Sequence, residues 1–155
     1  MSTSDLTVRE LLDMHETALA ELRCRGVVRT NDSPSGRYAE WLARQVLGGT
    51  LAPNSEKSYD LEIPDGTRIQ VKCRVVRNGN AGERQLSPFR SFDFDQALII
   101  LFNTSYDVQR AVLLTADLAR KIARWRDYVR AFVLIASDTA LDQGDDVTAR
   151  FLSAS

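Results

Sequence analysis

The chain has 155 residues, of which 44% are hydrophobic and 26% are charged, and its formal net charge is −1. These values are typical of one soluble globular domain. They exclude a disordered chain, a collagen-like repeat and a protein that coats nucleic acid through overall positive charge. Two cysteines and one histidine are too few for a disulfide scaffold or for a four-ligand zinc site built from Cys and His. We expect both thiols to be buried or half-buried.

An amphipathic helix is predicted over residues 8–25. Thr7 and Glu10 have the spacing of a capping box, in which a hydroxyl and a carboxylate bind the free backbone amides at the start of a helix. The apolar side chains and one histidine then recur at helical spacing: Val8, Leu11, Leu12, His15, Leu19 and Leu22. This stripe favours packing of one helix face, with His15 as a packing or surface residue.

A second helix is predicted from Pro34 to Gly48. Ser33 is a candidate N-cap, and Pro34 suits the first helical position because it lacks a backbone amide hydrogen. Gly48 and Gly49 then end the helix, since glycine adopts the left-handed backbone conformation that follows many helices.

A β-hairpin is predicted next, with strands at residues 58–63 and 68–76 joined by a turn at residues 64–67, PDGT. Apolar and polar side chains alternate along the second strand. One face of this strand is therefore expected to lie against a core, and the other carries Gln70 and Lys72.

The hairpin register brings three polar groups together. Pairing Ile63 with Ile69 keeps apolar side chains opposite each other, and it places Asp60 opposite Lys72, near Gln70. A carboxylate, an amide oxygen and an ammonium group on one face suit metal-assisted chemistry on a phosphate, because Mg²⁺ prefers oxygen ligands. The alternative is a solvated hairpin face with an Asp–Lys pair worth less than about 1 kcal/mol.

The second half of the chain continues as mixed α/β. Residues 97–102 are predicted to form a buried strand with residues 108–114 as its antiparallel neighbour. A helix over residues 115–125 and a strand over residues 129–136 follow. Residues 137–155 are expected to form an acidic tail with a last helical turn.

These elements predict a mixed α/β fold in which helices flank a mixed sheet of about four to five strands. We expect one domain over residues 1–155, with an N-terminal helix in residues 1–28, a core in residues 30–136 and the acidic tail. The longest apolar run is too short to span a bilayer, so no membrane association and a cytoplasmic location are expected.

Asp60, followed after nine residues by Gln70-Val71-Lys72, resembles the core motif of the PD-(D/E)XK nuclease superfamily in its Gln-x-Lys variant. Four segments are also similar to small bacterial proteins of that superfamily: residues 36–41 (GRYAEW), 58–60 (SYD), 68–72 (RIQVK) and 84–93 (RQLSPFRSFD). The resemblance covers roughly residues 30–150. It implies a restriction-endonuclease-like core and a Mg²⁺-dependent nuclease, with Mn²⁺ as a substitute.

The resemblance also implies the role of each site residue. Asp60 and Gln70 would bind the metal with the backbone carbonyl of Val71, Glu40 would reach it from the preceding helix, and Lys72 would orient the attacking water. Gln70 stands where the superfamily usually has an acid, which removes one negative charge from the site and puts catalysis in doubt. Glu40, or Glu62 on the same strand face as Asp60, is the candidate to compensate.

Basic and aromatic side chains surround this motif in the sequence. The basic candidates for binding a phosphodiester backbone are Arg68, Arg74, Arg77, Arg84 and Arg90. Phe89 and Phe92 are candidates to stack on a base, and the alternative is that they pack a loop against the sheet. A second basic set, in residues 120–130, suits either a nucleic-acid contact or a solvated helix face.

The leading hypothesis is an endonuclease that hydrolyses phosphodiester bonds, with DNA a more probable substrate than RNA. The first alternative is a nuclease-fold module that binds nucleic acid without cutting it. The second is a component that binds an acidic protein partner. A homodimer is expected, because one chain offers a single active centre and cutting both strands needs two.

Overall fold

The computed structural model describes residues 2–29, 34–78 and 80–154. The candidate N-cap Ser33 lies outside the described residues. The helices, in chain order, are η1 (Thr3–Asp5), α1 (Val8–Cys24), α2 (Pro34–Leu47), η2 (Ala81–Arg84), α3 (Ala116–Ile122), α4 (Asp138–Leu141) and α5 (Thr148–Leu152). The strands are β1 (Thr50–Leu51), β2 (Leu61–Glu62), β3 (Arg68–Val75), β4 (Gln96–Phe102), β5 (Val108–Thr115), β6 (Arg124–Arg126), β7 (Ala131–Val133) and β8 (Asp145–Asp146).

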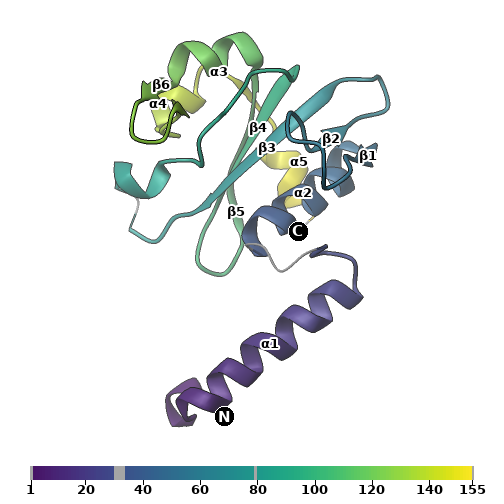
Figure 1. Cartoon of the computed structure of the whole chain (residues 1–155), viewed down its shortest axis with the longest axis vertical. Helices are drawn as coiled ribbons and strands as arrows, with labels where there is room; N and C mark the ends of the chain where they lie inside the picture. The colour runs from purple at the N-terminus through teal and green to yellow at the C-terminus, as the bar shows by residue number, and fades with distance from the viewer. Residues whose placement is uncertain (1, 30–33, 79, 155) are drawn as a thin grey trace.

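Helix α1 begins with the predicted capping box: the Thr7 side chain accepts from the Glu10 backbone amide, and the Glu10 carboxylate accepts from the Thr7 amide. The helix extends away from the sheet, and none of its residues is buried (Figure 1). The expectation that its apolar stripe packs on the chain is therefore wrong over most of its length. Cys24, at its end, is exposed, which corrects the expectation for that thiol.

Helix α2 lies against the sheet and ends at two glycines, as predicted. Gly48 and Gly49 have φ angles of +78° and +90°, which glycine adopts without steric cost. A Cβ atom on Gly49 would overlap the backbone carbonyl of Glu62 on β2. The close approach of the two backbones therefore requires glycine there, and it fixes the end of α2 beside β2.

The central sheet is mixed and has six strands in the order β1-β2-β3-β4-β5-β8. Strands β3 and β4 are parallel, and the remaining neighbours are antiparallel. The β4–β5 pair is the predicted one. The predicted register of the β2–β3 hairpin, with Ile63 opposite Ile69, is wrong. Leu61 lies opposite Ile69, and the Ile63 amide donates to the Thr67 carbonyl across a shorter loop. Because the shift is two residues, each side chain keeps its predicted face.

The helix expected over residues 115–125 ends at Ile122. Ala123 is buried with extended backbone, and Arg124–Arg126 form β6, which pairs with β7 in a separate two-stranded sheet. The strand expected over residues 129–136 is likewise confined to Ala131–Val133. A hairpin, β6–β7, thus replaces the end of the predicted helix and the start of the predicted strand.

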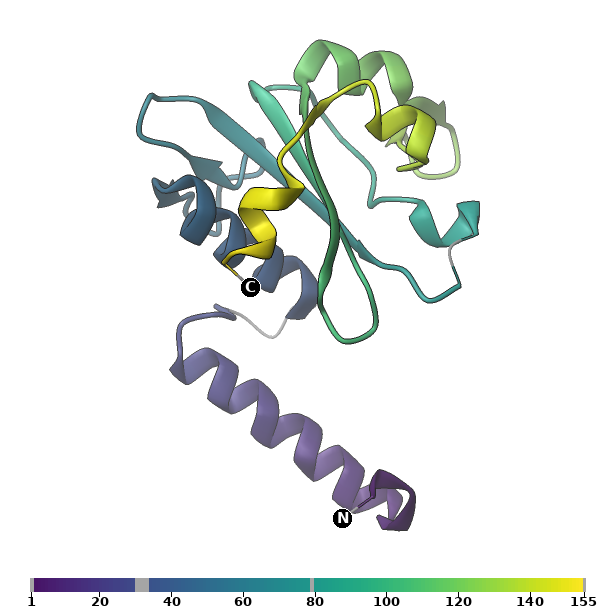
Figure 2. The ribbon, with the colours of Figure 1, turned by 180° about the vertical axis from the view of Figure 1, so that it is seen from behind.

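Apolar side chains cover both faces of the sheet. On one face, Ile69 and Val71 of β3 pack with α2 and with Phe151 of α5, and α5 lies beside α2 in the view from behind (Figure 2). The residues expected to form an acidic tail therefore add β8 and α5 to the domain. On the other face, Ile99 of β4 packs with α3, α4 and the segment that contains Phe89.

The parity of β3 decides where its polar side chains lie. Because Ile69 and Val71 face α2, Gln70 and Lys72 point to the opposite side, where residues 85–91 cross the sheet. Within the described residues, no helix is long and apolar enough to cross a membrane.

Candidate active site

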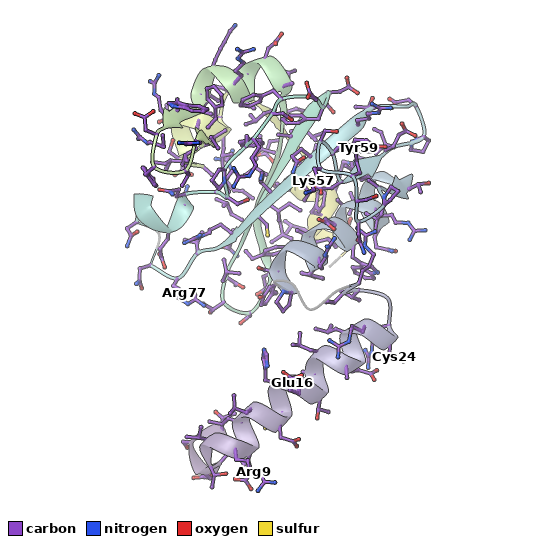
Figure 3. The ribbon with its side chains drawn as sticks, in the orientation of Figure 1. Arg9, Glu16, Cys24, Lys57, Tyr59 and Arg77 are labelled. Carbon is purple, nitrogen blue, oxygen red and sulfur yellow. The ribbon has the colours of Figure 1, made fainter. Side chains whose placement is uncertain are left out.

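A cleft of about 800 Å³ opens along β3, between the start of α2 and residues 85–88. It is lined by all the residues that were predicted to bind metal or catalyse: Glu40, Asp60, Gln70, Val71 and Lys72. A second hollow shares Asp60, Gln70 and Lys72 with it and extends to Lys57 and Arg90. Lys57, which precedes β2, lines the second hollow, and Arg77, which follows β3, lines the main cleft; the two residues lie well apart (Figure 3).

Asp60 is held against β3 by two backbone contacts. Its own amide donates to the carbonyl of Ile69 at 2.8 Å, and its Oδ2 atom accepts from the amide of Val71 at 2.7 Å. Because Leu61 lies opposite Ile69, Asp60 adjoins Gln70 and does not face Lys72 directly, which corrects the predicted pairing, although all three side chains line the cleft. The Val71 amide and carbonyl point to the same side of the strand, so the carbonyl also faces Asp60.

Glu40 reaches the same place from α2. Its side chain is 13% exposed and lies 3.1 Å from the Arg37 guanidinium and 3.5 Å from the Arg29 guanidinium. Burial, the neighbouring Glu40 charge and a hydrogen bond shared with Glu40 raise the pKa of Asp60 to about 6. The Val71 amide and the Lys72 ammonium oppose this rise. The negative charge of Glu40 thus disfavours the ionised form of Asp60, and a cation bound between them would offset this repulsion.

Lys72 is positioned by the segment that crosses β3. Its Nζ atom donates to Ser87 Oγ and to the carbonyl of Pro88, both at 3.0 Å, and lies 4.9 Å from the centre of the Phe89 ring. Burial lowers the pKa of Lys72, and the Asp60 carboxylate opposes that shift. A half-buried lysine with a fixed ammonium group is suited to orient a water or a phosphate oxygen.

The four predicted metal ligands in this cleft are oxygen donors, which suit a hard divalent cation, and the free thiol of Cys73 also lines the cleft. Asp60, Glu40, the side-chain oxygen of Gln70 and the Val71 carbonyl line one side of the cleft. In the described part of the chain, no group of three or more His, Cys, Asp or Glu side chains gathers as a metal site. The carboxylates of this cleft that could hold Mg²⁺ are those of Glu40 and Asp60.

Glu62 does not join these donors. It pairs with Arg68 at 3.6 Å, and both side chains are about half exposed. The candidate to compensate for Gln70 is therefore Glu40.

The predicted nucleic-acid-binding residues differ in their availability. Arg74 and Arg77 line the main cleft, and Arg90 lines its extension. Arg68 also stacks on Tyr59, with 5.0 Å between guanidinium carbon and ring centre. Arg84 is engaged elsewhere, since it binds Asp138 at 2.9 Å and the Ala136 carbonyl.

Phe89 needs a correction. The ring is 2% exposed and packs in the core, stacked on Phe92 at 5.4 Å. A buried ring has no free face on which a base could stack. The prediction that Phe89 binds nucleic acid is therefore wrong, and the ring instead packs against the Lys72 ammonium group. Phe92 is half-buried beside it.

Sequence reasoning missed Ser87, Pro88 and Arg37 as partners of the site. Residues 84–92 have no regular period, so nothing in the sequence indicated that this segment crosses β3. Arg37 lies one helical turn before Glu40, and this spacing is the signal that could have identified it.

Comparison with protein-family models gave no match, and comparison with curated proteins gave none either.

Proposed function

We propose that this protein is a Mg²⁺-dependent nuclease of the PD-(D/E)XK kind, which hydrolyses phosphodiester bonds, with DNA the favoured substrate. One observation carries the proposal: Glu40 of α2, Gln70 and Lys72 of β3, and Asp60, which directly precedes β2, line the same cleft. A chance Gln-x-Lys motif on a solvated hairpin would give no reason for a helix carboxylate to meet Asp60.

Each residue has a role that follows from its contacts. Asp60 and Glu40 supply the negative charge that would hold Mg²⁺, and Gln70 and the Val71 carbonyl supply neutral oxygen donors. When bound, Mg²⁺ lowers the pKa of a water and offsets charge on the phosphate. Ser87 and the Pro88 carbonyl hold the Lys72 ammonium group in the cleft that Asp60 also lines, where it would orient the attacking water and stabilise the negative charge that develops on the phosphate.

Arg74, Arg77 and Arg90 line the cleft and its extension. They would bind the phosphates on either side of the scissile one through charge-assisted hydrogen bonds. The affinity is therefore expected to fall steeply with salt concentration.

The test is cleavage of end-labelled DNA and RNA oligonucleotides with Mg²⁺ or Mn²⁺. Asp60→Ala and Lys72→Ala should each abolish cutting, whereas Glu62→Gln, an exposed carboxylate on β2, should cut at the wild-type rate. Cutting that survives both Asp60→Ala and Lys72→Ala would overturn the proposal, because a contaminating nuclease or another site would then be responsible.

A second candidate is a module of this fold that binds nucleic acid without cutting it. The observation that favours it is that the cleft has two carboxylates, Glu40 and Asp60, with Gln70 at the position of the usual third acid. The site therefore offers one negative charge fewer to a metal ion. Calorimetric titration with Mn²⁺ separates the two candidates. No heat of binding, together with salt-dependent affinity for DNA, would favour the module.

A further inference from the structure

The β6–β7 hairpin presents exposed aromatic side chains beside the cleft. Trp125 on β6 is 50% exposed, and Tyr128 in the turn is 74% exposed. The Trp125 Nε1 atom donates to Asp127 at 2.7 Å, which holds the indole ring in place. Large exposed rings on a short hairpin are unfavourable in water, and two of them on one hairpin indicate a binding surface.

A row of rings connects Trp125 with the site. Trp125 contacts Phe132, its cross-strand partner, with 5.2 Å between ring centres. Phe132 contacts Phe92 at 5.3 Å, and Phe92 stacks on Phe89, the ring beneath the Lys72 ammonium. Exposure rises along this row, from the buried Phe89 to the half-exposed Trp125. The row therefore leads from the catalytic lysine to the surface.

The backbone makes the same connection. Phe89 and Phe132 exchange amide-to-carbonyl hydrogen bonds of 2.7 and 3.0 Å, and Leu86 donates to Leu134 at 3.0 Å. Residues 85–89 thus run beside β7 and the residues after it, joined by two isolated antiparallel bridges, Gln85–Ile135 and Phe89–Phe132, and β6 pairs with β7. The segment that holds Lys72 and the hairpin that carries Trp125 are one continuous surface, and Val129 in the hairpin turn lines the cleft itself.

The hairpin is also positively charged. Residues 124–133, from the start of β6 to the end of β7, contain three basic side chains, Arg124, Arg126 and Arg130, and one acidic side chain, Asp127. Arg126 precedes the turn and Arg130 ends it, and both are exposed. Aromatic rings interleaved with arginines match the chemistry of a strand of nucleic acid, in which stacked bases alternate with phosphates.

We propose that the β6–β7 hairpin is a stacking platform for unpaired bases, so that the substrate has a single-stranded segment next to the scissile phosphate. Trp125 and Tyr128 stack on bases, and Arg126 and Arg130 bind the adjoining phosphates. Base pairs inside a duplex have both faces covered by their neighbours, so only unpaired or splayed bases can use these rings. This inference rests on the proposed function for the position of the scissile bond.

The test uses the full chain with EDTA present, so that no cutting occurs. The chain has two tryptophans, and Trp41→Phe leaves Trp125 as the only one. A dT oligonucleotide should quench the fluorescence of this variant, whereas a blunt hairpin duplex of equal charge should not. By fluorescence anisotropy, Trp125→Ala and Tyr128→Ala should each weaken single-strand binding about tenfold, as expected for one stacked base.

Two further variants serve as controls. Leu12→Ala removes an exposed apolar side chain from α1 and should leave the affinity unchanged. Trp125→Phe keeps a ring and should restore most of it. Because Trp125 packs on Phe132 whereas Tyr128 is largely in solvent, Tyr128→Ala tests the proposal even if Trp125→Ala fails to fold.

Several results would overturn the inference. Equal affinity and quenching for duplex and single strand, an unchanged affinity of Tyr128→Ala, or no binding of either probe at low salt would each do so. The proposed nuclease function is judged separately by cutting that depends on Asp60. Cutting that Tyr128→Ala leaves unchanged would refute the platform alone, and stacking without any cutting would refute the nuclease alone.

Discussion

Replacing Asp60 by asparagine is expected to stabilise the metal-free protein at neutral pH. Burial and the Glu40 carboxylate raise the pKa of Asp60 to about 6, whereas the ordinary value for an unfolded chain is about 3.9. A difference of about 2 pH units corresponds to about 3 kcal/mol, by which the ionised carboxylate opposes folding. Asparagine carries no charge, and its side-chain oxygen can still accept from the Val71 amide.

The stabilisation should depend on pH. Below pH of about 4, Asp60 is protonated in both states, so Asp60→Asn changes the free energy of unfolding little. Between pH values of about 4 and 6 the folded protein binds more protons than the unfolded chain, so the wild type loses stability as pH rises. Above pH of about 6 the full penalty is present. For a chain of this size, about 3 kcal/mol corresponds to a rise in Tm of roughly 6–12 °C.

The measurement is the free energy of unfolding in urea, with EDTA, at pH 4 and at pH 7.5. Glu62→Gln is the matched control, because it neutralises an exposed carboxylate whose pair with Arg68 contributes little. If Asp60→Asn gave the same stability difference at both pH values, or were less stable than the wild type at pH 7.5, the charge of Asp60 would not be what opposes folding.

Three further predictions concern residues around the cleft. Gln70→Glu should bind Mn²⁺ about tenfold more tightly by calorimetry, because it adds a charge worth about 1.4 kcal/mol; unchanged affinity would mean that side chain 70 does not reach the ion. Gly49→Ala should lower the free energy of unfolding by at least about 2 kcal/mol in urea, since it adds overlap to backbone strain. Gly66→Ala is its control, with a similar φ of +89° and open space around a Cβ, and should cost about half as much. Ser87→Ala should slow cutting without changing Mn²⁺ affinity, because it removes an acceptor of Lys72; a parallel loss of Mn²⁺ affinity would contradict that role.

Alternation predicted the hairpin and its faces, but not the register. The predicted pairing of Ile63 with Ile69 leaves a five-residue loop, yet the Ile63 amide donates to the Thr67 carbonyl. The three-residue loop is possible because Gly66 has a φ of +89°, the left-handed position at which such loops place glycine. The loop length was therefore readable from Gly66.

The hairpin β6–β7 was not predictable in the same way. Residues 120–126 (RKIARWR) have the composition of a charged helix end, and local propensity favours continuing the helix. Tertiary contacts end the helix at Ile122 instead: Ala123 is buried in extended conformation, and Trp125 packs on Phe132. These partners follow later in the chain or lie across the sheet, so no local pattern contains them.

The sequence predicted which side chains line the candidate site, but not the residues that hold those side chains in position. Asp60 and Lys72 line the same cleft because a register shift of two residues preserves the face of every side chain, so the error in register did not place them on opposite faces. The position of Ser87 depends on residues 86–89 pairing with β7, more than forty residues later. The supports that hold Lys72 therefore come from contacts that are distant in sequence.

The net charge of −1 conceals a separation of charge that the fold uses. Residues 66–92 hold six basic side chains and one acidic side chain, and residues 120–130 hold five and one. The pairing of residues 86–89 with β7 joins these two segments into one surface around the cleft. The acids of the C-terminal segment gather instead around Arg110, which pairs with Asp138, Asp142 and Asp146. A chain with a net charge of −1 thus gathers Lys72, Arg74 and Arg77 along one cleft, and under the proposed function their field would steer an anionic strand toward Lys72.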